Sequence, residues 1–177
     1  MSEQDELPTT VDELLERMER ARAAFYASLA GLSDEQLAAP LTERDWSVAD
    51  HMAHLAVWMD GIIAAFDGTS RWAAMGADGP TGATGFDELN ERLRAPHAGK
   101  SPAEARAWLE ATHERMAARL RGMTMEQLRR PYSHYQPGEA RDDAGAPFLE
   151  WVVGDTYSHY DEHRGWIEAA LRQRGWA

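Results

Sequence analysis

Cysteine is absent from this sequence of 177 residues. A chain without a thiol has no cysteine nucleophile, no Cys-ligated zinc or iron–sulfur cluster, and no disulfide scaffold. A chain of this length can bury about two-thirds of its unfolded surface, so it needs neither a disulfide nor a structural metal to fold. We therefore expect one domain over residues 1–177, with residues 1–8 flexible.

Basic side chains are also scarce. The chain has 18 Lys and Arg residues against 30 Asp and Glu residues, a formal net charge of −12. Such a surface repels a phosphate backbone, so no nucleic-acid partner is expected. No apolar run approaches the ~18 residues of a membrane span, and the first residues lack the basic-then-apolar order of a signal peptide. The composition favours a cytoplasmic protein without membrane contact.

Helix signals dominate what is present. Apolar residues recur at steps of three and four, and Thr10, Ser47 and Ser101 stand where N-caps are expected. The spacing predicts four long helices, at about 10–31, 48–66, 102–121 and 147–174, and a short one at about 86–95. The connections 67–100 and 122–146 are long, a feature that is usually functional in compact domains. The pattern predicts an all-α protein built as a four-helix bundle.

Two histidines are the first candidates for chemistry. His159 and His163 are four residues apart on the last predicted helix, which stacks their side chains on one face, about 6 Å apart along the axis. Two imidazoles so placed can share a divalent ion. The same spacing also arises by chance on helices, so it does not establish a metal by itself.

A third histidine, His54, stands on the second long helix in a stripe with His51 and Trp58. A catalytic zinc site uses three protein ligands and one open position, and His54 would complete that set if the two helices are neighbours. The alternative is a structural histidine that is hydrogen-bonded to a carbonyl or to Asp50. The spacing does not decide between the two.

A di-iron carboxylate site is excluded, because it needs a Glu-x-x-His motif on each of two helices and only Glu110 with His113 has that spacing. His113 is expected at the boundary of the core rather than in the site. His51, Asp155 and Tyr160 are further candidates for positioning or proton transfer. Asp155 precedes His159 by one turn and could orient its imidazole.

Two regions of the sequence carry a family resemblance. The segments LSDEQL (32–37), WSVAD (46–50) and HLAVW (54–58), and later TYSHYDEH (156–163) followed by Trp166-Ile167, resemble the signature of the DinB superfamily. The tyrosine-rich second motif, with Asn90-Glu-Arg92 in the long connection, is most similar to the ClbS/DfsB branch. The resemblance extends over about residues 9–173.

The resemblance implies an up-down-down-up bundle with long crossover loops. It also implies a divalent metal, most often zinc or nickel, at His54, His159 and His163. Some relatives use low-molecular-weight thiols as cosubstrates, and the ClbS branch is associated with self-protection against a reactive natural product.

The sequence therefore favours a metal-dependent enzyme that acts on a small molecule, with hydrolysis or detoxification of a reactive electrophile as the reaction. The connection 67–100 would roof the open coordination position. One alternative is a non-enzymatic protein that sequesters a hydrophobic metabolite between Trp-lined helices. Another is a low-molecular-weight-thiol transferase, and a third is a bundle that keeps the histidines without turnover. A homodimer is left open.

Overall fold

The computed structural model describes residues 6–41, 46–77, 85–139 and 143–176. These residues are helical or irregular and include no β-strand, as an all-α fold requires. Residues 1–5, on which most of the expected flexible start falls, lie outside the described residues. The helices are α1 (Val11–Ser28), α2 (Asp34–Ala38), α3 (Val48–Phe66), α4 (Arg71–Met75), α5 (Phe86–Arg94), η1 (Ala95–His97), α6 (Pro102–Arg121), α7 (Met125–Leu128), α8 (Tyr132–Tyr135), α9 (Leu149–Gly154) and α10 (Tyr157–Arg174).

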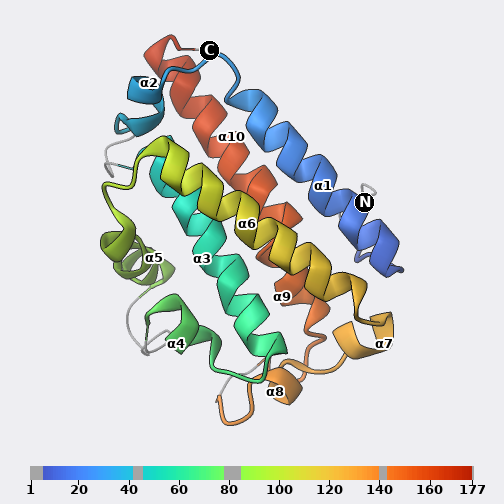
Figure 1. Ribbon diagram of the computed structural model, residues 1–177. Helices are drawn as coiled ribbons and strands as arrows, with labels where there is room; N and C mark the ends of the chain where they lie inside the picture. Colours follow the sequence, from blue (N-terminus) through green and yellow to red (C-terminus); the bar gives the residue numbers. More distant parts are fainter. Residues whose placement is uncertain (1–5, 42–45, 78–84, 140–142, 177) are drawn as a thin grey trace.

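The long helices α1, α3, α6 and α10 lie side by side (Figure 1). Followed along the chain, α1 runs in one direction, α3 and α6 run in the other, and α10 runs back beside α1. α3 packs against α6, and α1 packs against α10. The short helices α4 and α5 belong to the connection between α3 and α6 and flank α3 on its outer side (Figure 1).

The predicted caps set the helix starts. The Thr10 hydroxyl accepts a hydrogen bond from the backbone N–H of Glu13 and so caps α1. Ser47 and Asp50 form a reciprocal capping box at the start of α3, and Ser101 with Glu104 forms another at α6. Such caps satisfy backbone donors that the first turn leaves free, each worth about 1 kcal/mol. They fix the residue at which α3, the helix of His51 and His54, begins.

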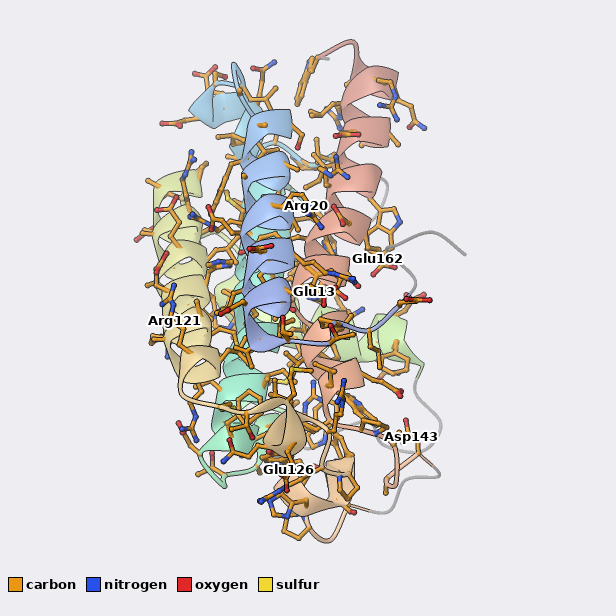
Figure 2. All side chains as sticks on the ribbon, turned by 90° about the vertical axis from the view of Figure 1, so that its right-hand side faces the viewer. Glu13, Arg20, Arg121, Glu126, Asp143 and Glu162 are labelled. Carbon is orange, nitrogen blue, oxygen red and sulfur yellow. The ribbon has the colours of Figure 1, made fainter. Side chains whose placement is uncertain are left out.

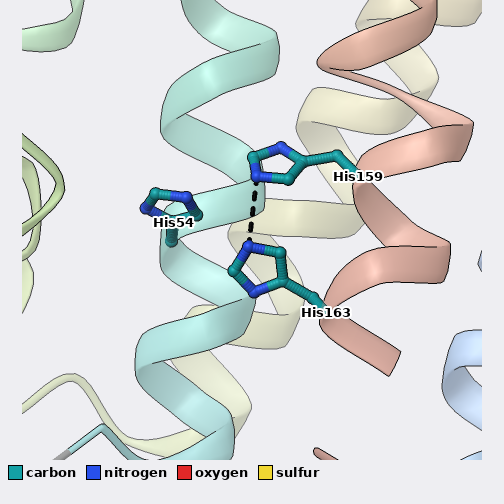
Figure 3. A group of neighbouring side chains, drawn as sticks. All are labelled: His54, His159 and His163. Carbon is teal, nitrogen blue, oxygen red and sulfur yellow. Dashed lines mark hydrogen bonds between the residues drawn. The ribbon is translucent and has the colours of Figure 1, made fainter. Parts of the chain in front are cut away.

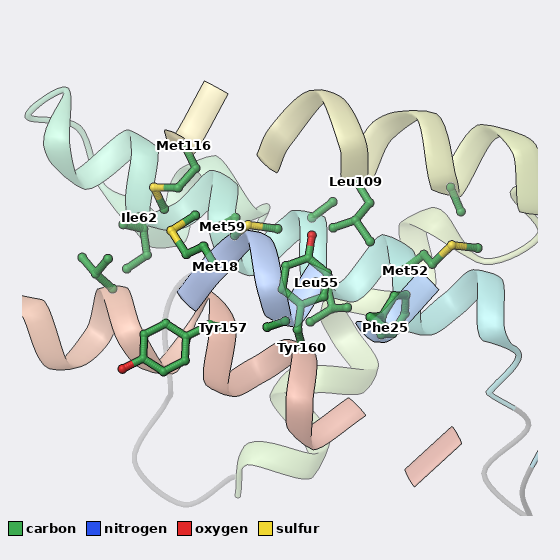
Figure 4. Close-up of a cluster of buried hydrophobic side chains, with 14 of the residues drawn as sticks. Met18, Phe25, Met52, Leu55, Met59, Ile62, Leu109, Met116, Tyr157 and Tyr160 are labelled. Carbon is green, nitrogen blue, oxygen red and sulfur yellow. The ribbon is translucent and has the colours of Figure 1, made fainter. Parts of the chain in front are cut away.

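The core lies between the four long helices and is rich in methionine (Figure 4). Met18 of α1, Met59 of α3 and Met116 of α6 are fully buried in it. Charged side chains such as Arg121 and Glu126 lie on the outside (Figure 2). No described helix is both long and apolar enough to cross a membrane.

One prediction of the fold is wrong: the segment 147–174 is not a single helix. α9 ends at Gly154, and α10 begins at Tyr157. Thr156 between them has φ −122° and ψ −107°, outside the helical region, and its hydroxyl donates to the Val152 carbonyl at 2.5 Å. The Arg71 guanidinium contacts Asp155 at 2.6 Å and ties this break to α4. In addition, the first helix ends at Ser28, and the connection 122–146 contains α7 and α8.

Candidate metal centre

Three histidines from two helices converge beside α3. His54 projects from α3, and His159 and His163 project from α10 toward it (Figure 3). Each offers one ring nitrogen, and these nitrogens lie within 4.8 Å of one another. The helix spacing places His159 and His163 on one face of α10, as predicted, and the packing of α10 on α3 brings His54 opposite them.

The donor set fits a divalent ion. The Nε2 atoms of His159 and His163 are 3.1 Å apart, close to the about 3.3 Å between two ligands of a tetrahedral ion with bonds of 2.0–2.1 Å. The Nδ1 atoms of His54 and His159 are buried and have no hydrogen-bond partner among the described residues. Buried polar atoms are normally paired, so the unpaired Nδ1 of His54 fits a site that a ligand would complete.

The surroundings keep the imidazoles neutral. Burial lowers the pKa of His51 to about 4 and that of His159 to about 3. Burial also lowers the pKa values of His54 and His163 well below the ordinary value, and neighbouring histidines lower them further. A neutral imidazole has a free lone pair, which is the form that binds a metal.

His51 contacts one of the three histidines. Its Nδ1 lies 2.7 Å from Nδ1 of His163, and its ring lies against Trp46. If His163 uses Nε2 as a ligand, its Nδ1 carries the proton and donates it to Nδ1 of His51. Hydrogen bonds of this kind fix the orientation and tautomer of a ligating histidine. The geometry therefore suits His51 to a positioning role rather than to direct contact with an ion.

Asp155 lies at the site but does not orient His159. Its carboxylate accepts a hydrogen bond from Arg71, a side chain that is 99% buried and therefore needs a counter-charge. The Arg71 guanidinium lies over the rings of Trp58 and Trp72. Nothing in the local sequence of α4 predicts that Arg71 reaches Asp155 at the end of α9.

Tyr160 is placed away from the three histidines. It is fully buried in the core, its ring packs edge-on against Phe25 of α1, and its hydroxyl lies 3.4 Å from Nδ1 of His113. His113 is likewise buried, not at the boundary as expected, and it does not line the pocket beside the histidine cluster. The structure does not bring either residue to the candidate site.

A pocket of about 1130 Å³ opens beside the cluster. His51, His54, His159 and His163 line it. Its other walls carry the indole rings of Trp46, Trp58 and Trp166, residues of α5, and several acidic side chains. A space of this size holds a small organic molecule.

α5 supplies one wall of this pocket, through the described residues 86–88, 90 and 91. Within the connection 67–100, which was predicted to cover the site, α5 is thus a part that lines the pocket. Residues 78–84 of that connection lie outside the described residues. Neither Phe86 nor Glu88 was predicted as a site residue. An amphipathic helix within a long connection was the only signal that could have pointed to them.

Comparison with known proteins gives one family. A family model for the DinB superfamily matches residues 6–167. No curated protein matches the chain.

Solved structures share the fold. The protein described as "Sibling Lethal Factor Precursor - DfsB" is 17% identical, with a TM-score of 0.72 over 96% of this chain and 99% of that chain. A structural-genomics protein from Streptococcus pneumoniae is 16% identical, with a TM-score of 0.74 over 94% and 93% of the two chains.

The colibactin self-resistance protein ClbS, solved in complex with a dsDNA, is 14% identical, with a TM-score of 0.69 over 94% of this chain and 98% of that chain. The DNA complex is a property of that protein. For this chain, whose net charge is −12, the absence of a nucleic-acid partner stays a prediction.

Proposed function

The chain belongs to the DinB superfamily, and from this membership and the histidine cluster we propose that it is a metal-dependent enzyme acting on a small molecule. His54, His159 and His163 hold one divalent ion, zinc or nickel. The observation that carries the proposal is the convergence of three neutral, largely buried imidazoles on the floor of a pocket. When bound, such an ion supplies Lewis acidity and lowers the pKa of a water or substrate group that it holds.

The other side chains of the pocket have separate tasks. His51 accepts the proton of His163 Nδ1 and so keeps Nε2 of His163 free as a donor. Trp46 and Trp58 contact the ring of His54 and cover it against bulk water. Arg71 holds Asp155 at the break between α9 and α10, just before His159.

The pocket provides no hydroxyl or thiol nucleophile for a covalent intermediate. Its described lining contains no Ser, Thr or Cys side chain, and the whole chain has no cysteine. The attacking group is then water, a second substrate or one of the carboxylates that line the pocket. We favour water, and the reaction is then hydrolysis, or a related detoxification, of a reactive electrophile.

A second function is sequestration without turnover. The size of the pocket and its three indole-bearing residues favour it, because they would hold a largely apolar metabolite whether or not a metal is present. The fold likeness to a self-resistance protein is compatible with this role.

The proposal is tested by elemental analysis of protein purified without an affinity tag. We expect one divalent ion per chain in the wild type and none in His159→Ala, with an unchanged helical circular dichroism spectrum, because the core does not include His159. His134→Ala, which removes an exposed histidine, is the control and should keep the metal. A wild type that stays metal-free under full loading would refute the metal-dependent function.

Turnover separates the two functions. The metal-loaded protein is incubated with a panel of reactive electrophiles, and their loss is followed against the His159→Ala variant. Catalytic turnover in the wild type alone supports the enzyme. Stoichiometric protection in both proteins supports sequestration.

A further inference from the structure

Acidic side chains gather around the pocket. Its described lining contains five carboxylates and no Lys or Arg side chain. These carboxylates come from two opposed walls, α5 on one side and the α9–α10 region on the other. They are Asp87, Glu88, Glu91, Asp155 and Glu162.

Among the five, Asp155 and Glu91 are neutralised from outside the pocket. Asp155 is paired with Arg71, and Glu91 is paired with Arg94. Glu88 and Glu162, in contrast, make no hydrogen bond or ion pair with any described residue, and both are exposed. Glu162 projects from the side of α10 that is turned away from Glu13 and Arg20 of α1 (Figure 2). A carboxylate in the first turn of α5, such as Glu88, is also stabilised by the helix dipole without any ligand. The dipole of α5 does not account for Glu162, which comes from α10.

Aromatic rings stand beside these carboxylates. Phe86 is 64% exposed and Trp166 is 52% exposed, and both line the pocket. Large apolar side chains are normally buried, and among the described residues only Leu7 is a third exception. An aromatic face next to a carboxylate is the usual setting for an organic cation, which both groups attract.

The floor of the pocket points independently to a ligand. His54 is 4% exposed and Trp58 is 8% exposed, and both line the pocket. His54 Nδ1 and Trp58 Nε1 are buried without a hydrogen-bond partner among the described residues. The Nδ1 atom of His54 is also a candidate metal donor, but the Trp58 indole N–H only donates hydrogen bonds and does not bind a metal. It therefore indicates a space that holds a polar group of the ligand.

From these features we infer that the ligand of this pocket is an organic cation with an aromatic or apolar body. The cationic end lies at the mouth, between Glu88 and Glu162, with its body against Phe86 and Trp166. The reactive end points to the histidines. This inference rests on the proposed function for the location of the reactive end, but the preference for a cation follows from the walls alone. A divalent ion on the floor would repel a cation placed beside it, which is why the two ends must be apart.

The test uses three probes with the same naphthalene body. They are (2-naphthylmethyl)trimethylammonium, neutral 2-naphthylmethanol and the anion 2-naphthylacetate. A quaternary ammonium cannot coordinate a metal, so its binding reports on the walls. Calorimetric titrations are made with the full-length protein both zinc-loaded and after treatment with EDTA, because an alcohol or a carboxylate could bind zinc directly.

We expect the cation to bind about tenfold more tightly than the neutral probe in the EDTA-treated protein, and the anion to bind more weakly than either. The preference should shrink when the salt is raised from about 20 mM to about 500 mM, because exposed carboxylates are screened. The double variant Glu88→Gln, Glu162→Gln should lose most of the preference. Its control is Glu114→Gln, Glu126→Gln, which makes the same change in net charge on exposed positions outside the pocket and should keep the preference.

Each outcome has one meaning. Equal affinity for the cation and the neutral probe, or the same loss in both double variants, overturns the inference and leaves the metal-dependent function untouched. A cation preference in a protein that binds no metal upholds the inference and refutes the proposed function. Unchanged binding of the neutral probe in the double variant shows that the pocket remains folded.

Discussion

Replacing His51 tests whether a hydrogen bond from outside the metal ligands controls the candidate metal centre. Its Nδ1 lies 2.7 Å from Nδ1 of His163, a short contact between two buried rings. Removal of such a partner typically lowers metal affinity about 10- to 100-fold, or about 1.4 to 2.7 kcal/mol. We expect a loss of this size in His51→Leu, which removes the acceptor and puts an apolar side chain of similar bulk in its place.

His51→Asn is the matched variant. The Asn Oδ1 atom can take the place of the His Nδ1 atom and accept the same proton, so most of the zinc affinity should remain. Affinities are measured by competition with a chromogenic chelator at pH 7.5, and circular dichroism checks that both variants fold. Zinc affinity within twofold of the wild type in His51→Leu would refute the positioning role of His51.

Three further predictions concern stability. Burial lowers the pKa of His51 to about 4 and that of His159 to about 3, so protonation of these histidines favours the unfolded chain. The metal-free protein is therefore fully stable above about pH 6.5 and loses about 1.4 kcal/mol per pH unit for each of the two histidines below it, until the folded-state pKa of that histidine is reached. Urea unfolding at pH 7.5 and 5.5 will measure this loss. Arg71→Met should cost about 3 to 5 kcal/mol in the same assay, because Asp155 loses the guanidinium that compensates it, whereas Arg71→Met with Asp155→Leu should recover much of that loss. Gly165→Ala should add about 0.5 to 1 kcal/mol without changing metal affinity, since a Cβ at this exposed helical position meets no atom within 4 Å, and a destabilised variant would contradict the placement of Gly165.

The long helices could be predicted because their signals are local. The caps at Thr10, Ser47 and Ser101 and the apolar steps after them lie within one or two turns of each other in the sequence. The break between α9 and α10 could not be predicted in this way. Thr156 continues the apolar stripe and reads as helical, while the pairing of Asp155 with Arg71 joins residues that are 84 positions apart.

In the candidate site, too, only the features with local signals could be predicted. The spacing of His159 and His163 is a property of one helix. His54 was a candidate from its stripe on the second helix, and the family resemblance then added it to the metal ligands. The contact of His51 with His163 depends on how α3 and α10 pack, which no local pattern contains. Tyr160 shows the converse error of reading sequence proximity as spatial proximity. It follows His159 directly, but one residue turns about 100° around a helix, and this rotation carries its ring into the core.

The positions of the arginines distinguish the two candidate reactions, thiol transfer and hydrolysis. A low-molecular-weight thiol that carries carboxylates would need basic groups beside the histidines. Arg164, the nearest in sequence, pairs with Asp161 and lines a different groove between α1 and α10. Arg71 is buried against Asp155, and Arg94 is held by acidic partners. Each of these guanidinium groups is already paired, and the pocket walls are acidic. The walls would therefore repel an anionic thiol but not a neutral water molecule, and this difference favours hydrolysis over thiol transfer.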